Sequence, residues 1–313
     1  MLIRFFGTRG SIPAPLSAQQ IRAKIDSVVQ RITSRDIESL DARARFIASL
    51  PDWLYGTVGG NTTCVRITSA DGTHIILDAG SGIRDIPLAA PFPKDKTYHI
   101  MFSHFHWDHL QGLPFFTPAY SNQYRLIFHS ASSKLRAILE NQMTAPYFPV
   151  PLPDAFTRNI EYNTFTQGVP FSVGGMTIVT KKMRHPGDSY AYKFTENGTA
   201  FIFATDTELS RTDFEQTKIN MDFFEGADTL VLDTQYTTKE AIEKENWGHS
   251  SFCYAVDFAA AWKIKILYLF HHDPAYDDKK LYSILKAARW YSRNVSRKNV
   301  EVNLAQEGMT FEL

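Results

Sequence analysis

Three histidines and one aspartate lie between His104 and His109 of this 313-residue chain, in the sequence HFHWDH. The segment follows a hydrophobic run, so we expect it to begin where a β-strand ends. Side chains two apart on an extended chain project the same way, which would let His104 and His106 bind one cation. A turn after them would direct Asp108 and His109 to a second position. Imidazole nitrogens with a carboxylate favour Zn, with Mn or Fe as alternatives, whereas Mg and Ca prefer oxygen ligands.

Three more candidate ligands, His185, Asp206 and His271, each follow a predicted strand elsewhere in the chain. Ligand sites of α/β proteins gather at the C-terminal ends of strands. A single histidine or aspartate at such a position is as often only a cap of the strand end. Together with the segment 104–109, however, the three residues would supply enough ligands for a site with two divalent metal ions.

The composition limits the classes of protein to which the chain can belong. Lys+Arg and Asp+Glu are 33 each, and 44% of the residues are hydrophobic, so we expect a packed globular core and no broad basic face for extended nucleic acid. Arg289, Arg293 and Arg297 form one basic stripe, interpreted as a solvated helix face. Two cysteines, a short N-terminal apolar segment and no long apolar run predict a cytoplasmic protein without membrane association.

Strand and helix patterns alternate along the whole chain, which predicts one α/β domain over residues 1–313. The expected strands cover 2–6, 62–69, 74–78, 98–103, 125–129, 171–173, 177–182, 190–195, 199–205, 230–233, 264–270, 300–304 and 309–313. The expected helices cover 132–143, 250–262 and 278–292. Residues 17–50 show apolar residues at helical spacing and predict a helical insertion, either a lid, a dimer contact or a pair of helices packed on the outside.

This arrangement resembles the metallo-β-lactamase-fold hydrolases. The family's HxHxDH motif matches at His104, His106, Asp108 and His109; its later ligands match His185, Asp206 and His271 in order; and the aspartate that precedes the motif matches Asp78 in the sequence LDAG. The resemblance runs from Asn61 to the C-terminus and leaves residues 17–50 outside it. It implies a four-layer αβ/βα sandwich of two mixed sheets with helices outside.

The resemblance also implies how the ligands divide. One metal ion would bind His104, His106 and His185, the other would bind Asp108, His109 and His271, and Asp206 would bridge them. A hydroxide held between two such ions would be the nucleophile. Asp78 would orient a ligand without touching metal, and Asn61, Ser189 and Glu208 are expected around the ligands or at the substrate.

Two features indicate the branch of the family. Position 206 is aspartate and not the cysteine of many true β-lactamases, and His249 in WGHSSF resembles the histidine of the ribonuclease Z and small phosphodiesterase branch. There it would protonate the leaving group, although a structural histidine before a helix is the alternative. Asp108, Asp206 and His249 are therefore the expected catalytic residues.

We expect a phosphodiesterase for a small anionic substrate, a nucleotide or a cyclic-nucleotide-like phosphodiester. The alternatives are a thioester, lactone or other carboxylic ester hydrolase on the same metal site, and a tRNA 3′-processing endoribonuclease, for which no basic arm is visible. Trp107, Tyr120, Tyr147 and Phe148 could form aromatic walls for a base, or simply pack in the core. Branch members often form dimers, so a homodimer is possible.

Overall fold

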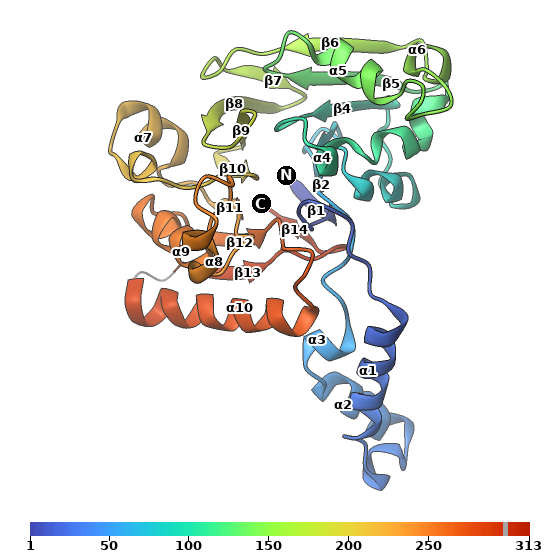
Figure 1. Cartoon of the computed structure of the whole chain (residues 1–313), viewed down its shortest axis with the longest axis vertical. Coiled ribbons are helices and arrows are strands. Elements are labelled where there is room, and N and C mark those ends of the chain that lie inside the picture. Colours follow the sequence, from blue (N-terminus) through green and yellow to red (C-terminus); the bar gives the residue numbers. More distant parts are fainter. Residues whose placement is uncertain (297–299) are drawn as a thin grey trace.

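The computed structural model describes residues 1–296 and 300–313, and two seven-stranded sheets account for their strands (Figure 1). The first sheet has the order β14-β1-β2-β3-β4-β5-β6, with strands β14(Thr310–Glu312), β1(Leu2–Gly7), β2(Cys64–Thr68), β3(His74–Leu77), β4(Thr97–Met101), β5(Arg125–Ser130) and β6(Ile160–Thr164). The second has the order β13-β12-β11-β10-β9-β8-β7, with strands β13(Glu301–Leu304), β12(Ile266–Phe270), β11(Thr229–Asp233), β10(Thr199–Ala204), β9(Ser189–Glu196), β8(Met176–Met183) and β7(Phe171–Val173).

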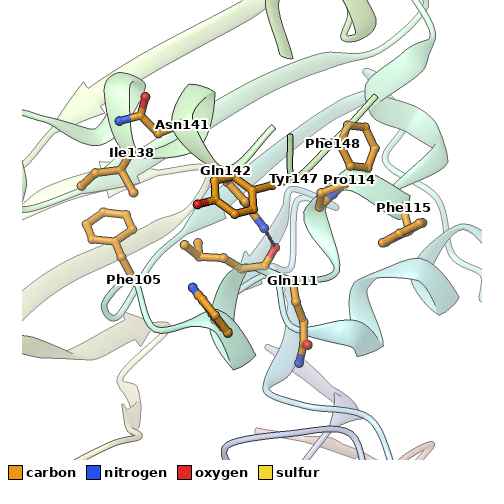
Figure 2. A pocket seen from close by; sticks show the side chains of 11 residues that line it. Phe105, Gln111, Pro114, Phe115, Ile138, Asn141, Gln142, Tyr147 and Phe148 are labelled. Carbon is orange, nitrogen blue, oxygen red and sulfur yellow. Dashed lines mark hydrogen bonds between the residues drawn. The ribbon is translucent and has the colours of Figure 1, made fainter. Parts of the chain in front are cut away.

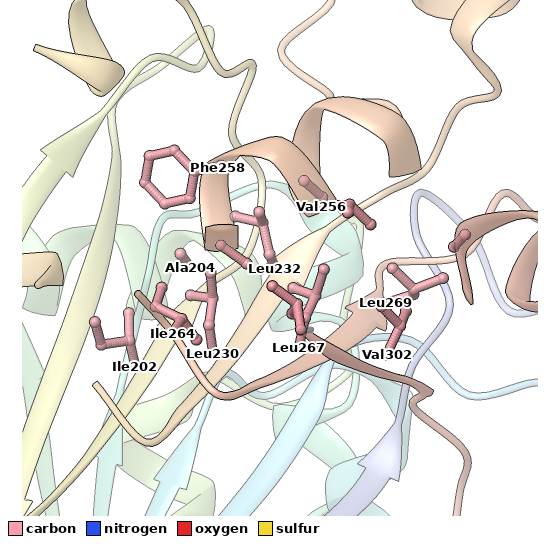
Figure 3. Packing of buried hydrophobic residues seen from close by; sticks show 14 of the residues in the cluster. Ile202, Ala204, Leu230, Leu232, Val256, Phe258, Ile264, Leu267, Leu269 and Val302 are labelled. Atoms are coloured by element: carbon pink, nitrogen blue, oxygen red, sulfur yellow. The ribbon is translucent and has the colours of Figure 1, made fainter. Parts of the chain in front are cut away.

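Side-chain alternation along the strands builds three apolar layers. Phe201 and Phe203 of β10 point between the sheets, where they join Ile3 and Phe5 of β1 in one buried cluster. The intervening Ile202 and Ala204 belong to a second cluster on the outer face of their sheet, packed against helix α9(Phe252–Ala261) (Figure 3). A third cluster covers the outer face of the first sheet. The layers follow the order helix, sheet, sheet, helix, so the predicted αβ/βα sandwich is confirmed.

The helices divide between the two outer faces and an arm. The second sheet is covered by α9 and α10(Asp278–Tyr291), and the remaining helices on that half are α7(Lys218–Phe224) and α8(Thr238–Glu243). The first sheet carries α4(Trp107–Leu110), α5(Leu135–Gln142) and α6(Leu152–Ala155). Short 3-10 helices cover Ser34–Ile37, Ser81–Leu88, Leu113–Phe115, Thr117–Tyr120 and Arg211–Phe214, and a π-helical turn covers Ser292–Ser296.

Most of the predicted elements are present, with ends that differ by a few residues. The Asn197-Gly198 hairpin joins β9 and β10, and both turn residues have the positive φ that such a two-residue turn requires. Strand β6 was not predicted, because its sequence IEYNT is largely polar and lies at the exposed edge of the sheet. The short helices α7 and α8 were also missed. Arg297 of the predicted basic stripe lies outside the described residues.

The segment 17–50 is helical, as predicted, and forms an arm that extends away from the two sheets (Figure 1). It contains α1(Ala18–Val29) and α2(Leu40–Ser49), and α3(Asp52–Tyr55) follows at its base. Lys24 of α1 forms an ion pair with Asp278 at the start of α10, which ties the arm to the body. The apolar stripe Ile21, Ile25 and Val29 is largely exposed, at 47%, 58% and 62%. Its role as a lid or a dimer contact stays a prediction.

In the described part of the chain, no helix combines the length and the apolar character that crossing a membrane requires.

Two buried histidines outside the predicted metal ligands predict a loss of stability in mild acid. Burial lowers the pKa of His74 to about 4 and that of His129 to about 3. A histidine in the unfolded chain has a pKa near 6.5, so below about pH 6.5 the unfolded state binds more protons than the folded state. The free energy of unfolding should therefore fall as the pH drops from about 6.5 toward 4.

The measurement is urea unfolding of metal-free protein at about pH 7.5 and pH 5. His74→Phe keeps an aromatic ring against Tyr98, which the His74 ring meets edge-on. Because phenylalanine does not titrate, this change should reduce the pH dependence by on the order of 1–2 kcal/mol. An unchanged difference between the two pH values would show that His74 is not a source of the acid sensitivity.

Candidate metal centre

The predicted ligands meet at one edge of the sandwich because they follow strands that run in the same direction. Strands β3, β4 and β5 are parallel, and so are β10, β11 and β12, so their C-terminal ends lie at common edges. The segment His104–His109 follows β4, His185 follows β8, Asp206 follows β10 and His271 follows β12. The fold thus brings together side chains that are up to 167 residues apart, from His104 to His271.

Ligand atoms of the seven predicted metal-binding residues form two groups, each gathered within 4.8 Å. The first group contains His104, His106, His185 and Asp206. Within it the His185 Nε2 atom lies 3.1 Å from His106 Nδ1. His106 is exposed and the other three residues are buried, so the first group opens to solvent on the His106 side.

The second group contains Asp108, His109, Asp206 and His271, all of them buried. The Nε2 atom of His271 lies 3.1 Å from Asp108 Oδ2, and the Nε2 atom of His109 lies 3.3 Å from the same oxygen. The His271–Asp108 contact is within hydrogen-bond range, and the ligand atoms of the three side chains lie close enough together to bind a single cation.

Asp206 belongs to both groups, and its two oxygens face different ones. Oδ2 lies 3.5 Å from His104 Nε2 and 3.8 Å from His185 Nε2. Oδ1 lies 3.2 Å from His109 Nε2 and 3.1 Å from His271 Nε2. A carboxylate placed in this way can coordinate one cation through each oxygen, which is the bridging position that the sequence assigned to it.

The electrostatics of the two groups are those of a site that needs positive charge. Burial opposes ionisation of Asp206, yet His109, His271 and His104 hold the pKa of its carboxyl well below the usual range. Burial likewise opposes protonation of His109, but the carboxylates of Asp206, Asp108 and Asp78 raise its pKa well above the usual value. Metal-free protein therefore keeps a proton on His109 that a bound cation would replace.

Unsatisfied buried atoms test whether the residues fit metal ions. Nε2 of His104 and Nε2 of His109 are buried without a hydrogen-bond partner among the described residues. Buried polar atoms in folded proteins are normally hydrogen-bonded, so two orphaned ring nitrogens in one place call for another partner. Both atoms lie against the Asp206 carboxylate, and a nitrogen-rich donor set of this kind suits a transition metal ion such as Zn. The residues fit two divalent cations.

A carboxylate behind the ligands sets the orientation of two of the rings. The His109 Nδ1 atom donates to Asp78 Oδ2 at 2.9 Å, and Ser103 Oγ donates to the same oxygen at 2.7 Å. Since the Ser103 hydrogen is used there, its oxygen accepts from His104 Nδ1 at 3.0 Å. Both histidines therefore carry their proton on Nδ1 and direct Nε2 at the two groups. Asp78 lies behind the candidate ligands, where it is placed to orient them.

A backbone carbonyl oxygen sets the orientation of the His185 ring. Its Nδ1 atom donates to Gly248 O at 2.9 Å, so its Nε2 lone pair faces the first group. The Glu208 carboxylate accepts from the backbone N–H of Gly248 at 2.9 Å and of Asn246 at 3.0 Å. Glu208 thus holds the loop whose carbonyl positions His185.

The segment Gly10–Ser11 closes the second group from the opposite side. Ser11 N donates to Asp108 Oδ2 at 2.7 Å, and Gln235 Nε2 donates to Ser11 Oγ at 3.2 Å. A Cβ atom on Gly10 would lie 2.5 to 3.0 Å from three ring atoms of His271. Glycine is therefore required at this position for the His271 ring to stand where it does.

Ser189 and Asn61 lie beside the site and bond within the protein. Ser189 Oγ donates to Thr205 O at 3.1 Å, which joins β9 to β10 directly before Asp206. The Asn61 side chain donates to Asp85 Oδ2 at 3.1 Å and accepts from Ser81 Oγ at 3.0 Å, while its backbone N–H is bonded to Glu307. A substrate contact by either residue stays a prediction.

His249 lies against both groups. Its ring stacks on that of His271, with centroids 5.0 Å apart, and lies 5.3 Å from that of His185. His249 Nδ1 donates to Asp233 Oδ2 at 2.6 Å. Although burial opposes it, Asp233 raises the pKa of His249 to about 9.

Asp233 was missed from the sequence as a site residue. It is fully buried, ends β11 and also accepts the backbone N–H groups of Thr207 and Gln235, at 3.1 and 3.0 Å. Its position at a strand end is the same signal that identified Asp206 and His271, and it could have been found in that way.

The remaining histidines are structural, as expected. His272 Nε2 donates to Ala305 O at 2.9 Å and takes no part in either group, so His271 is the residue of that pair that reaches the centre. His99 Nδ1 lies 3.1 Å from His129 Nε2 between neighbouring strands, and His74 packs on Tyr98.

Comparison with known proteins identifies the family of this chain. Residues 73–272 match the model of the beta-lactamase superfamily domain, which is more than half of the chain. The chain belongs to the beta-lactamase superfamily. A search of curated proteins found no match to its sequence.

Solved structures of this superfamily share the whole fold at low sequence identity. The metallo-beta-lactamase fold protein YhfI from Bacillus subtilis superposes with a TM-score of 0.66 and 16% identity, over 100% of this chain and 98% of its own. A diphosphatase of the PhnP family and the short form of human tRNase Z each superpose with a TM-score of 0.61 and 16% identity. Both superpositions cover 100% of this chain, and they cover 97% of the diphosphatase and 99% of the tRNase Z. These likenesses speak for the fold alone.

We expect Asp206→Asn to lower metal content. Loss of the charge between the two groups should reduce binding from about two Zn ions per chain to about one or fewer, as measured by elemental analysis after dialysis. Asp222→Asn, which removes an exposed carboxylate paired with Lys218, is the matched control and should retain both ions. Full metal content in Asp206→Asn would exclude the bridging role.

We also expect Gly10→Ala to disturb the second group specifically. The added Cβ atom would displace the His271 ring, so about one Zn ion should be lost while the first group keeps its ligands. Gly56→Ala is the control: Gly56, like Gly10, lies outside the positive-φ region, and its new methyl group would meet only Asp52 O, at 3.7 Å. Equal metal content in the two variants would contradict the proposed packing.

Proposed function

We propose that this protein is a metal-dependent phosphodiesterase that hydrolyses a small anionic phosphodiester, such as a nucleotide or cyclic nucleotide. The observation that carries the proposal is the Asp233–His249 pair beside both candidate metal groups. Hydrolysis of a carboxylic ester, thioester or lactone on the same site does not need a second, separately positioned proton donor. Hydrolysis of a phosphodiester with a poor leaving group benefits from one.

The geometry of His249 suits proton donation. Its Nδ1–H is taken by Asp233, which leaves Nε2 as the ring nitrogen available to a substrate. The ring lies parallel to that of His271, at 19°, and beside that of His185. A phosphodiester bound between the two groups would thus have an imidazole near its departing oxygen, while Asp233 fixes the ring and favours its charged form.

Two divalent cations, for which Zn best suits the nitrogen-rich donors, would polarise the phosphate oxygens and lower the pKa of a water molecule. The chain itself supplies the arrangement. Asp78 and Gly248 O direct the ring nitrogens of His104, His109 and His185, and Ser11 N fixes the Asp108 carboxylate. These contacts are formed before substrate arrives, so little reorganisation accompanies the reaction.

The test of the proposal compares leaving groups. His249→Ala should lower kcat about 10²- to 10⁴-fold for a diester that releases a nucleoside or an alkyl alcohol, because the departing alkoxide then lacks a proton donor. For bis(p-nitrophenyl) phosphate, whose leaving group is stable without a proton, the loss should be less than about tenfold. The measurement is steady-state kinetics of the Zn-loaded protein with both substrates.

His99→Ala, a change of a histidine outside both metal groups, is the control and should leave both rates unchanged. An equal loss for the two leaving groups would exclude proton donation by His249. Faster turnover of a lactone or thioester than of any diester, unaffected by His249→Ala, would favour the carboxylic ester alternative. Cleavage of a pre-tRNA in preference to small diesters would favour the endoribonuclease alternative.

A further inference from the structure

We propose that a hollow beside the candidate metal centre binds an uncharged aromatic ester group of the substrate. The hollow has a volume of about 560 Å³ (Figure 2). Five of its lining residues are aromatic, namely Phe105, Trp107, Phe115, Tyr147 and Phe148, and we call it the aromatic hollow. The proposal rests on the proposed phosphodiesterase function and names the kind of diester that the site takes.

The aromatic hollow and the metal centre share one segment of chain. Phe105 and Trp107 line the hollow and stand on either side of His106, the exposed ligand of the first group. Leu110 also lines the hollow and directly follows His109 of the second group. A phosphate held at the open His106 side would therefore lie next to the hollow, and one of its ester groups could enter.

The second wall comes from α5 and the loop that follows it. Ile138 and Gln142 belong to α5, and Tyr147 and Phe148 follow that helix (Figure 2). Phe148 also meets Phe115 edge-on, with ring centroids 6.3 Å apart. The Pro-rich segment 145–156 thus contributes two aromatic side chains to this wall.

The lining indicates which kind of group would bind. None of the residues that line the hollow is acidic or basic, so a second phosphate or another charged group would lose hydration without gaining a partner. Three of the aromatic side chains are nevertheless largely exposed: Trp107 at 86%, Tyr147 at 82% and Phe115 at 62%. Exposed aromatic side chains around a concave surface are typical of ligand sites, and a flat ring would cover them.

Gln142 adds one polar position to the lining. Its Nε2 atom donates to Leu110 O at 2.7 Å, which fixes the orientation of the amide, since a carbonyl can only accept. The Oε1 atom is then left buried without a hydrogen-bond partner among the described residues. A ring that carries an N–H or O–H group, as nucleobases do, could satisfy this oxygen.

The test measures binding and does not depend on turnover. Phenyl phosphate and methyl phosphate carry the same phosphate, and only the first carries a ring. Their Kd values for the Zn-loaded protein, measured by isothermal titration calorimetry, should differ by about tenfold in favour of phenyl phosphate. Equal Kd values would overturn the proposal.

Variants test whether the preference for phenyl phosphate arises in the aromatic hollow. Tyr147→Ala and Phe115→Ala should each reduce the ratio of the two Kd values severalfold, because each removes one exposed aromatic wall. Tyr55→Ala removes a comparably exposed tyrosine, at 69%, from the base of the arm, and it should keep the wild-type ratio. An unchanged ratio in both hollow variants would show that the ring binds elsewhere, which would also overturn the proposal.

Failure of the aromatic-hollow proposal can be distinguished from failure of the proposed phosphodiesterase function. If the protein hydrolyses no phosphodiester but binds phenyl phosphate in preference to methyl phosphate through Tyr147 and Phe115, the aromatic hollow stands and the reaction assignment fails. If it hydrolyses diesters but binds the two monoesters equally, the reaction assignment stands and the hollow has no part in substrate selection.

Discussion

The arrangement of the site depends on one buried carboxylate. Asp206 lies between two sets of histidines, with each oxygen directed at a different set. A carboxylate with almost no contact to solvent cannot remain charged without positive partners, and here it faces the ligands of the two candidate metal positions and accepts a hydrogen bond from Thr205 Oγ1 at 2.8 Å. The need to neutralise this charge explains why ring nitrogens from three different strand ends converge on it. It also explains why one histidine, His109, carries a proton in metal-free protein.

Around that carboxylate, a set of backbone and side-chain contacts determines which way each ring nitrogen points. Asp78 receives hydrogen bonds from His109 and, through Ser103, from His104, while Gly248 O receives one from His185. Three of the residues at these strand ends, Asp78, Asp206 and His271, adopt positive φ, which is uncommon for residues other than glycine. Backbone of that kind is found at functional sites where the surrounding structure enforces it.

The two halves of the sandwich contribute differently to the proposed chemistry. The second sheet supplies Asp206, Asp233 and His271 from neighbouring parallel strands, so its carboxylates and the His249 ring form a rigid row. The first sheet supplies the segment 104–109, which carries ligands on one side and the aromatic residues Phe105 and Trp107 on the other. This short segment at the end of β4 would therefore take part in both metal binding and substrate selection.

The sequence by itself predicted the candidate ligands and the fold, and the fold is confirmed. The spacing in HFHWDH, the position of His185, Asp206 and His271 after apolar runs, and the alternation of strands and helices are local patterns, and a local pattern suffices to say where a strand ends. Edge strand β6 was not predicted, because a polar, exposed strand lacks the apolar alternation on which strand predictions rely.

Only the tertiary structure decided which residues meet. The position of one strand end relative to another depends on the order and direction of strands in the sheet, which no local pattern contains. For that reason the pairing of Asp233 with His249, the close approach of Gly10 to His271 and the hollow between the 104–115 segment and α5 became visible only in three dimensions. Each of them joins residues distant in sequence through contacts that packing alone creates.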